Sequence, residues 1–291
     1  MLKKFPRTLV GGLSLSRMII GTNWFLGYSH TSVSADRMIR ERYGSAETFK
    51  PVLETYVRYG VDTIMAPFGD SPELVRAIKE SEQKTGCEIF MVDTPAINVD
   101  DTEAGRREAQ EAIAAAAARG AKLCLIHHSS CEQLVNKNLG TIQRLDDYTK
   151  MIRDAGMIPG LSAHMPEIVV YADAGGYDVE TYIQIYNCMG FLMQVEIEAV
   201  GAIIHAAKKP VMTIKPMAAG RCSPFVGLTF AWNTIRPIDL VTVGAFSADE
   251  AEEDIEISLA ALEHRFPSLQ KRSSPNAKQA VFGAAEQQPP M

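Results

Sequence analysis

The chain has 291 residues, of which 46% are apolar and 22% charged, so it is long enough and apolar enough to bury a large core. Its net charge is −6, and its basic clusters are no longer than pairs, such as Lys3-Lys4 and Lys271-Arg272. This argues against a nucleic-acid partner, because proteins that bind nucleic acid concentrate Lys and Arg on one face. No stretch approaches the roughly 18 unbroken apolar residues of a membrane span, so we expect no membrane segment.

The cysteines indicate the compartment. There are five, an odd number, and they are scattered along the chain without a C-x-x-C pair. This is typical of reduced thiols and not of a disulfide framework. The apolar run after the basic start is interrupted by Gly11 and Gly12, so it makes a poor secretory signal. We therefore expect a cytoplasmic protein.

Taken in order, the chain predicts a short hairpin followed by eight strand–helix pairs. Residues 5–16 form two short runs around Gly11-Gly12, which favours a β-hairpin. The predicted strands cover residues 17–22, 61–65, 88–92, 122–127, 158–162, 181–185, 210–214 and 240–244. The helices that follow them cover residues 45–59, 72–85, 102–119, 145–155, 166–175, 191–207, 225–232 and 248–264, and another helix covers 35–43.

Eight strands that alternate with helices predict a parallel sheet closed into a (β/α)8 TIM barrel, with the N-terminal β-hairpin as an addition. We expect one domain over residues 1–270 and a loosely ordered tail over 271–291, which is rich in Ser, Pro, Gln and Ala. In such barrels the chemistry lies where the strands end. The polar residues at these ends include Asp93, His127, His128, Ser162, His164, Gln184, Lys215 and Arg221.

Six segments, in the right order, resemble the aldo-keto reductases. Residues 8–22 are similar to the opening hairpin and first strand, 123–127 to the fourth strand with its histidine, 160–164 to the G-x-S-N turn, 184–187 to the Q-x-x-Y-N strand, 215–220 to the S-P-L-x-x-G loop, and 243–253 to the closing strand and helix. The resemblance implies the barrel fold. It also implies carbonyl reduction by a nicotinamide cofactor, with an Asp, a Tyr, a Lys and a His at the site.

The catalytic residues depart from this resemblance. Met65 falls at the family's aspartate, and Phe68, which has no proton to donate, falls at its tyrosine. Asp93 stands in the neighbourhood of the lysine, so His127 is the one member of the four that is matched. Ordinary reductase activity is therefore not the expectation.

The cofactor contacts are matched in part. Ser162 and Gln184 match residues that hold the nicotinamide carboxamide, and with Arg221 they are the candidate cofactor-binding residues. However, Ile214 stands where an aromatic ring would stack on the nicotinamide, and Asp249 follows the last strand, where a 2′-phosphate would need a cation. NADP(H) is therefore the less favoured cofactor.

Two other chemistries fit the strand ends. Asp93, His127 and His164, with His128 as a further ligand, could hold a divalent metal, since imidazole and carboxylate suit such ions. Without a metal, His127 or His164 would be the base, Asp93 its partner, and Lys215 or Arg221 would stabilise an enolate or carboxylate. Lys215 could also form a Schiff base if burial lowers its pKa.

Two further residues near the strand ends are assigned structural roles. His128, one residue beyond His127, should point toward the helices, and Asp70 should cap the helix that begins at Pro72. The sequence thus predicts an enzyme for non-redox isomerase or lyase chemistry on a small polar carbonyl or hydroxy metabolite. A nicotinamide-dependent reductase with an unusual proton donor and a non-catalytic ligand-binding barrel are the alternatives. Homo-oligomerisation stays open.

Overall fold

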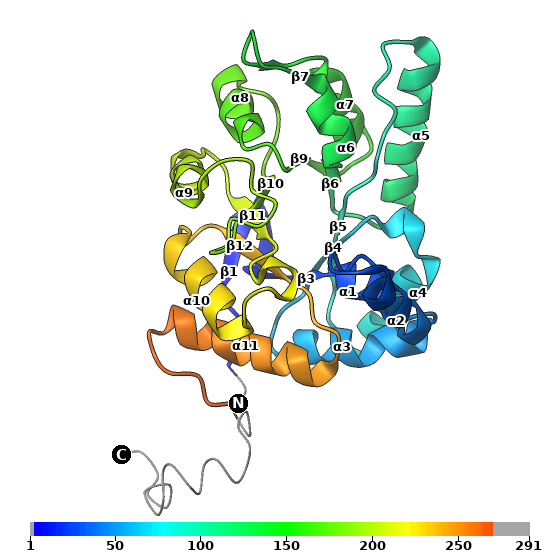
Figure 1. Cartoon of the computed structure of the whole chain (residues 1–291). Coiled ribbons are helices and arrows are strands. Elements are labelled where there is room, and N and C mark those ends of the chain that lie inside the picture. Colours follow the sequence, from blue (N-terminus) through cyan, green and yellow to red (C-terminus); the bar gives the residue numbers. More distant parts are fainter. Residues whose placement is uncertain (1–2, 270–291) are drawn as a thin grey trace, which may run out of the picture.

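The computed structural model describes residues 3–269, which form a closed barrel of eight parallel strands (Figure 1). The strands are β3 (Met18–Gly21), β4 (Thr63–Ala66), β5 (Phe90–Asp93), β6 (Leu123–Ile126), β9 (Ile158–Ala163), β10 (Tyr182–Ile185), β11 (Val211–Ile214) and β12 (Leu240–Val243). They pair in this order, and β12 pairs with β3 to close the ring. The predicted (β/α)8 barrel is confirmed. The tail predicted over 271–291 lies outside the described residues.

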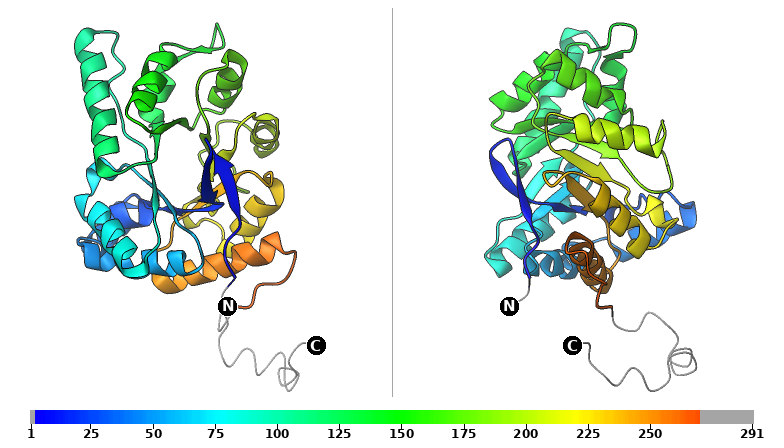
Figure 2. Two further views of the ribbon diagram at one scale, coloured as in Figure 1. Left: turned by 180° about the vertical axis from the view of Figure 1, so that it is seen from behind. Right: turned by 90° about the vertical axis from the view of Figure 1, so that its left-hand side faces the viewer.

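A helix follows each barrel strand, and the helices surround the barrel (Figure 2). They are α3 (Ala46–Arg58), α4 (Pro72–Thr85), α5 (Glu103–Arg119), α7 (Leu145–Asp154), α8 (Glu167–Gly175), α9 (Ile197–Ala206), α10 (Pro224–Thr234) and α11 (Ala248–Leu262). Most bounds agree closely with the prediction, but α9 begins at Ile197 and not at residue 191. The preceding turn is stabilised by Asn187, whose side-chain oxygen accepts the backbone N–H groups of Met189 and Phe191.

Short elements lie in the loops that leave the carboxyl ends of the strands. They are α1 (Asn23–Leu26), α2 (Val33–Arg42), α6 (His128–Cys131), the ribbon β7 (Val135–Asn136) and β8 (Thr141–Ile142), and the 3₁₀ turns η1 (Phe68–Asp70), η2 (Glu132–Leu134) and η3 (Ala218–Gly220). Of these, only α2 was predicted from the sequence, as the helix over residues 35–43. All of them surround the end of the barrel that carries chemistry in this fold.

The strand residues alternate between two apolar cores, as the period of two requires. Met65, Val92, Leu125 and Met212 belong to the cluster that fills the barrel interior. Their sequence neighbours, such as Ile64, pack in the larger cluster between the strands and the helices. This alternation decides which residues at the strand ends face the barrel mouth.

The N-terminal hairpin crosses the amino end of the barrel. Strands β1 (Arg7–Val10) and β2 (Leu13–Ser16) pair antiparallel through a two-residue turn. Gly11 and Gly12 both have positive φ, as a type I′ turn requires. The hairpin leads into β3, and its tip contacts Ile158 at the start of β9, which lies opposite β3 in the ring. Val10 and Leu15 join the barrel-interior cluster, so the hairpin closes this end.

A membrane-crossing helix is not found within residues 3–269, since none of the helices there combines sufficient length with sufficient apolar character.

Candidate functional site

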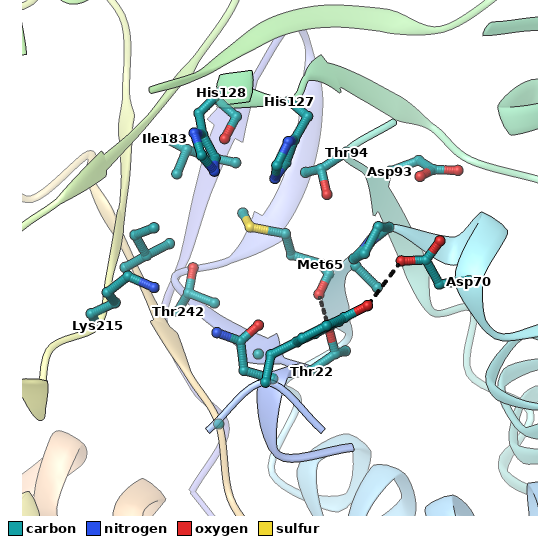
Figure 3. Close-up of a pocket in the computed structure, with 18 of the residues that line it drawn as sticks. Thr22, Met65, Asp70, Asp93, Thr94, His127, His128, Ile183, Lys215 and Thr242 are labelled. Carbon is teal, nitrogen blue, oxygen red and sulfur yellow. Dashed lines mark hydrogen bonds between the residues drawn. The ribbon is translucent and has the colours of Figure 1, made fainter. Parts of the chain in front are cut away.

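A cavity of about 730 Å³ opens at the carboxyl ends of the strands (Figure 3). Its apolar wall includes Met65, Ile183 and Ile214 from the barrel interior. The polar and titratable side chains that line it are Thr22, Asn23, Tyr28, Ser29, His30, Asp70, Asp93, Thr94, Arg119, His127, His128, Ser162, His164, Lys215 and Thr242. A concave, mostly apolar site with a few convergent polar groups is the usual form of a ligand pocket.

Three histidines form one cluster on the cavity wall. The ring centroids of His127 and His128 are 4.2 Å apart, and those of His128 and His164 are 3.8 Å apart with nearly parallel planes. The expectation that His128 points toward the helices is wrong (Figure 3). Strand alternation would send it there, but β6 ends at Ile126 and α6 begins at His128, so the backbone turns and the ring enters the cavity.

The tautomer of His127 follows from its neighbours. The backbone N–H of Ser129 points at His127 Nδ1 at 3.4 Å, and the Ser129 hydroxyl lies 2.7 Å from the same atom. Because a backbone N–H can only donate, Nδ1 is the acceptor and the ring proton is on Nε2. Burial, followed by the neighbouring His128, lowers the pKa of His127 to about 4. At neutral pH, His127 is thus an uncharged hydrogen-bond donor.

His164 is held by the loop that follows β6. The carboxylate of Glu132 accepts the backbone N–H groups of His164 at 2.7 Å and Met165 at 2.9 Å, which fixes the turn after β9. Burial, and then the neighbouring His128, lowers the pKa of His164 to about 3. His164 is therefore neutral at physiological pH.

Lys215 enters the cavity because its backbone is unusual. Because Ile214 faces the barrel interior, strand alternation would direct Lys215 to the helix layer, but Lys215 has a φ of +60°, in the left-handed region. For a non-glycine residue this conformation costs roughly 1–2 kcal/mol, and such strain tends to occur at functional sites. The turn directs the ammonium group toward the centre of the cavity (Figure 3). Burial lowers the pKa of Lys215 to about 8.

The Lys215 amine contacts a histidine that sequence reasoning missed. Its Nζ lies 2.8 Å from Nε2 of His30, and the side-chain amide nitrogen of Asn23 lies 3.2 Å from the same atom. Since the amide nitrogen can only donate, His30 Nε2 is an acceptor. His30 lies in the loop after β3, and its position in a loop that leaves the carboxyl end of a barrel strand was the one sequence signal for it.

Asp93 lies away from the histidines. It is fully buried, and its carboxylate accepts Nε and Nη2 of Arg119 at 3.2 and 2.8 Å. Val92 faces the barrel interior, so Asp93, one residue on, points toward α5 (Figure 3). Burial raises the pKa of Asp93, although Arg119 opposes this shift. The structure therefore does not bring Asp93 to His127 or His164.

Asp70 and Tyr28 occupy the opposite wall from Lys215. The prediction that Asp70 caps α4 is wrong, because Ser71 is the cap and accepts the backbone N–H of Leu74. Asp70 accepts the hydroxyl of Tyr28 at 3.4 Å, and both line the cavity. Phe68, at the tyrosine position of the resemblance, is buried and is absent from the cavity wall.

The three candidate cofactor-binding residues are placed differently. Ser162 lines the cavity, but Gln184 lies next to the inward-facing Ile183 and points toward the helix layer. Within residues 3–269, the buried Oε1 of Gln184 has no hydrogen-bond partner. Arg221 lies over the ring of Phe191, with its guanidinium 3.9 Å from the ring centroid, and is not on the cavity wall. Their cofactor-binding role stays a prediction.

The first turn of α11, where the last strand ends, does not fit a phosphate group. The N–H of Phe246 is bound by the carboxylate of Glu250 at 2.8 Å, and the N–H of Glu250 is bound by Ser247 Oγ at 3.2 Å. Two of the backbone donors near this terminus are therefore already bound to side chains of the chain itself. Asp249 and Glu250 add negative charge. This helix terminus does not suit NADP(H).

The metal hypothesis gains no support from the geometry. Among residues 3–269, no group of three or more His, Cys, Asp or Glu side chains is arranged to hold a metal ion. Asp93 is held by Arg119, and His128 and His164 are stacked face to face. Stacked rings direct their nitrogens side by side instead of toward a common centre. Metal binding by Asp93, His127 and His164 therefore stays an untested expectation.

Comparison with known proteins places the fold. No family model and no curated protein sequence matches the chain. The solved structure of a candidate aldo-keto reductase from Pseudomonas aeruginosa matches with a TM-score of 0.65 at 15% identity, covering 90% of this chain and 99% of that one. An aldo-keto reductase from Klebsiella pneumoniae in complex with NADPH matches with a TM-score of 0.58 at 14% identity, covering 94% and 98%. The chain thus has the fold of the aldo-keto reductases.

Proposed function

We propose that the chain is an enzyme for non-redox acid–base chemistry, of the isomerase or lyase type, on a small metabolite with a carbonyl group. One observation carries this proposal: the Nε2–H donor of His127 and the amine of Lys215 share one cavity. A donor aimed at a carbonyl oxygen stabilises the enolate that forms when a neighbouring proton leaves. A base with a pKa near the operating pH removes that proton efficiently.

The charge states support this assignment. Neutral imidazole suits a hydrogen-bond donor to an oxyanion, since it need not release a full proton. Burial lowers the pKa of Lys215 to about 8, so a useful fraction of the amine is uncharged at neutral pH. Within residues 3–269, the buried hydroxyl oxygen of Thr242 on the cavity wall has no hydrogen-bond partner. A polar atom of the substrate would satisfy it.

The second candidate is the nicotinamide-dependent reductase, for which Tyr28 would be the proton donor. It is the tyrosine that lines the cavity among the described residues. Burial and the neighbouring Asp70 raise the pKa of Tyr28, so it releases its proton less readily than an ordinary tyrosine. Because the α11 terminus also suits a phosphate poorly, the reductase function is less favoured than the non-redox function.

Solvent exchange tests the proposal directly. The protein is incubated in D₂O with a panel of 2-oxo acids and hydroxyketones, and loss of the α-proton signal is followed by ¹H NMR. We expect exchange with some members of the panel, and a loss of at least a hundredfold in His127→Gln. His205→Gln is the control, because His205 is exposed and contacts the Thr234 carbonyl. Equal exchange in both variants, or none in the wild type, would contradict the proposal.

A further inference from the structure

We propose that Lys215 is the nucleophile of the site and forms an imine with the carbonyl carbon of the substrate. This deepens the proposed function, on which it rests, because it limits the substrate to an aldehyde or ketone that reaches the Lys215 amine. It also assigns to Lys215 a covalent role that simple proton transfer does not require.

Lys215 differs from the surface lysines in its partners. Lys50, Lys84, Lys137 and Lys150 each hold a carboxylate. Within the part of the chain that the structure describes, no carboxylate pairs with Lys215, whose hydrogen bond goes to His30. A carboxylate would keep the amine protonated, whereas a neutral imidazole leaves it free to lose its proton. The site therefore favours the nucleophilic form of the amine.

His30 is placed to take that proton. Its Nε2 is an acceptor, as the Asn23 amide nitrogen 3.2 Å away requires, and it lies 2.8 Å from Lys215 Nζ. Proton transfer from the ammonium to Nε2 yields an uncharged amine directed into the cavity. His30 contacts Lys215 and acts on the substrate only through the Lys215 amine, so it is a positioning residue.

The other groups near the amine are basic too. His128 and His164 lie close enough to Lys215 for its charge to lower the pKa of each, and the same holds for His30. Arg221 adds a positive charge beside His30. Burial is the first cause of each lowered histidine pKa, so these rings are neutral and add no negative charge that would hold the proton of Lys215. Asp36, near His30, acts in the opposite direction on the pKa of His30.

The chemistry balances without an added redox partner. The uncharged amine attacks the carbonyl carbon, a C–N bond forms and the C–O π bond breaks; the nitrogen loses one proton as the oxygen gains one, which gives a carbinolamine. The C–O bond then breaks and the hydroxyl group leaves as water with the second proton from nitrogen, so that a C=N bond replaces the C=O bond. His127 Nε2–H can donate a hydrogen bond to the oxygen during attack. Water hydrolyses the imine after the reaction and restores the amine.

Formaldehyde with cyanoborohydride is the probe, because this small aldehyde forms an imine with any accessible uncharged amine and the reductant traps it. The full-length protein is treated at pH 7, and methylation of each lysine is followed by peptide mass spectrometry. We expect Lys215 to react at least ten times faster than Lys79, which is exposed on α4. A rate at Lys215 equal to or below that of Lys79 would overturn the proposal.

Two variants sharpen the test. His30→Ala should slow methylation of Lys215 several-fold at pH 7 but not at pH 10, where the amine is already uncharged, and His30→Gln should restore part of the rate through its amide oxygen. The outcome is separable from that of the proposed function. Methylation of Lys215 no faster than that of Lys79, with α-proton exchange intact in the wild type, would contradict the imine and leave acid–base chemistry standing. Rapid methylation of Lys215 without exchange of any panel member would contradict the proposed function and leave the reactive amine of Lys215 standing.

Discussion

The imidazole rings of His128 and His164 stack with their centroids 3.8 Å apart and their planes 19° from parallel. Two protonated rings at this distance would repel each other, and both are partly buried beside His127. Burial, followed by this repulsion, lowers the pKa of His164 to about 3, and burial lowers the pKa of His128 as well. The cluster is therefore built to remain uncharged.

This predicts sensitivity to acid. In the unfolded chain these histidines gain protons near pH 6.5, whereas in the folded protein His127 and His164 do so only near pH 4 and pH 3. Between these values the unfolded state binds more protons, so the free energy of unfolding falls as the pH falls. Urea denaturation from pH 7 to pH 4 measures this. The slope should decrease in His164→Gln but not in His205→Gln, and unchanged slopes would contradict the neutral cluster.

Removal of the Lys215 charge should stabilise the protein. Burial lowers the folded-state pKa of Lys215 from 10.5 to about 8, so below pH 8 folding carries the cost of a buried ammonium. We expect Lys215→Met to raise the free energy of unfolding at pH 7 by roughly 1–3 kcal/mol, allowing for partial solvent screening. The gain should shrink as the pH rises from 8 toward 10.5. Urea denaturation at pH 7 and pH 9.5 tests this, and a destabilised variant at pH 7 would contradict it.

The ion pair of Asp93 and Arg119 should be structural. Arg119→Met leaves the fully buried Asp93 carboxylate without its cation, so we expect a loss of about 3–5 kcal/mol in the free energy of unfolding. The double variant Asp93→Asn/Arg119→Met should recover much of this loss, since the buried charge is then absent. Thermal and urea denaturation measure both. If Arg119→Met is as stable as the wild type, the pair has no such role.

Nicotinamide binding should be absent or weak. Trp24 lines the cavity, so a dinucleotide bound there would quench its fluorescence. We expect no saturable quenching when NADPH is titrated to millimolar concentration, because Asp249 and Glu250 place negative charge at the α11 terminus and two nearby N–H groups are already bound to Glu250 and Ser247. Trp24→Phe is the matched variant, since it leaves Trp232 as the reference fluorophore. Saturable quenching that this variant abolishes would favour the reductase.

The barrel could be predicted from the sequence because its strands and helices have regular periods. The bounds of α4, for example, agree with the prediction. The site could be predicted where strand alternation continues to the mouth, as it does for His127, Ser162 and His164. It could not be predicted where the backbone turns. His128 enters the cavity because α6 begins there, and Lys215 enters through a left-handed turn, although alternation alone would exclude both.

The contact between Lys215 and His30 shows a different limit. The two residues are 185 positions apart in the chain, and no local pattern connects them. Only closure of the ring, which places β11 two strands from β3, brings their loops together. For Asp93, strand alternation after the inward-facing Val92 already indicates an orientation toward α5, where Arg119 binds its carboxylate, but no local pattern identifies Arg119 as its partner.

The hairpin at the amino end determines the path by which substrate enters and products leave. Because β1 and β2 cover that end with Val10 and Leu15 in the barrel interior, the cavity communicates with solvent through the opposite mouth. Substrate and product therefore share one path. If the reaction cleaves its substrate, the fragment nearer the mouth departs first. The fragment attached to Lys215 is released only after water has entered the cavity and hydrolysed the imine. Such an enzyme would show ordered release, with product inhibition by the second fragment competitive with the substrate.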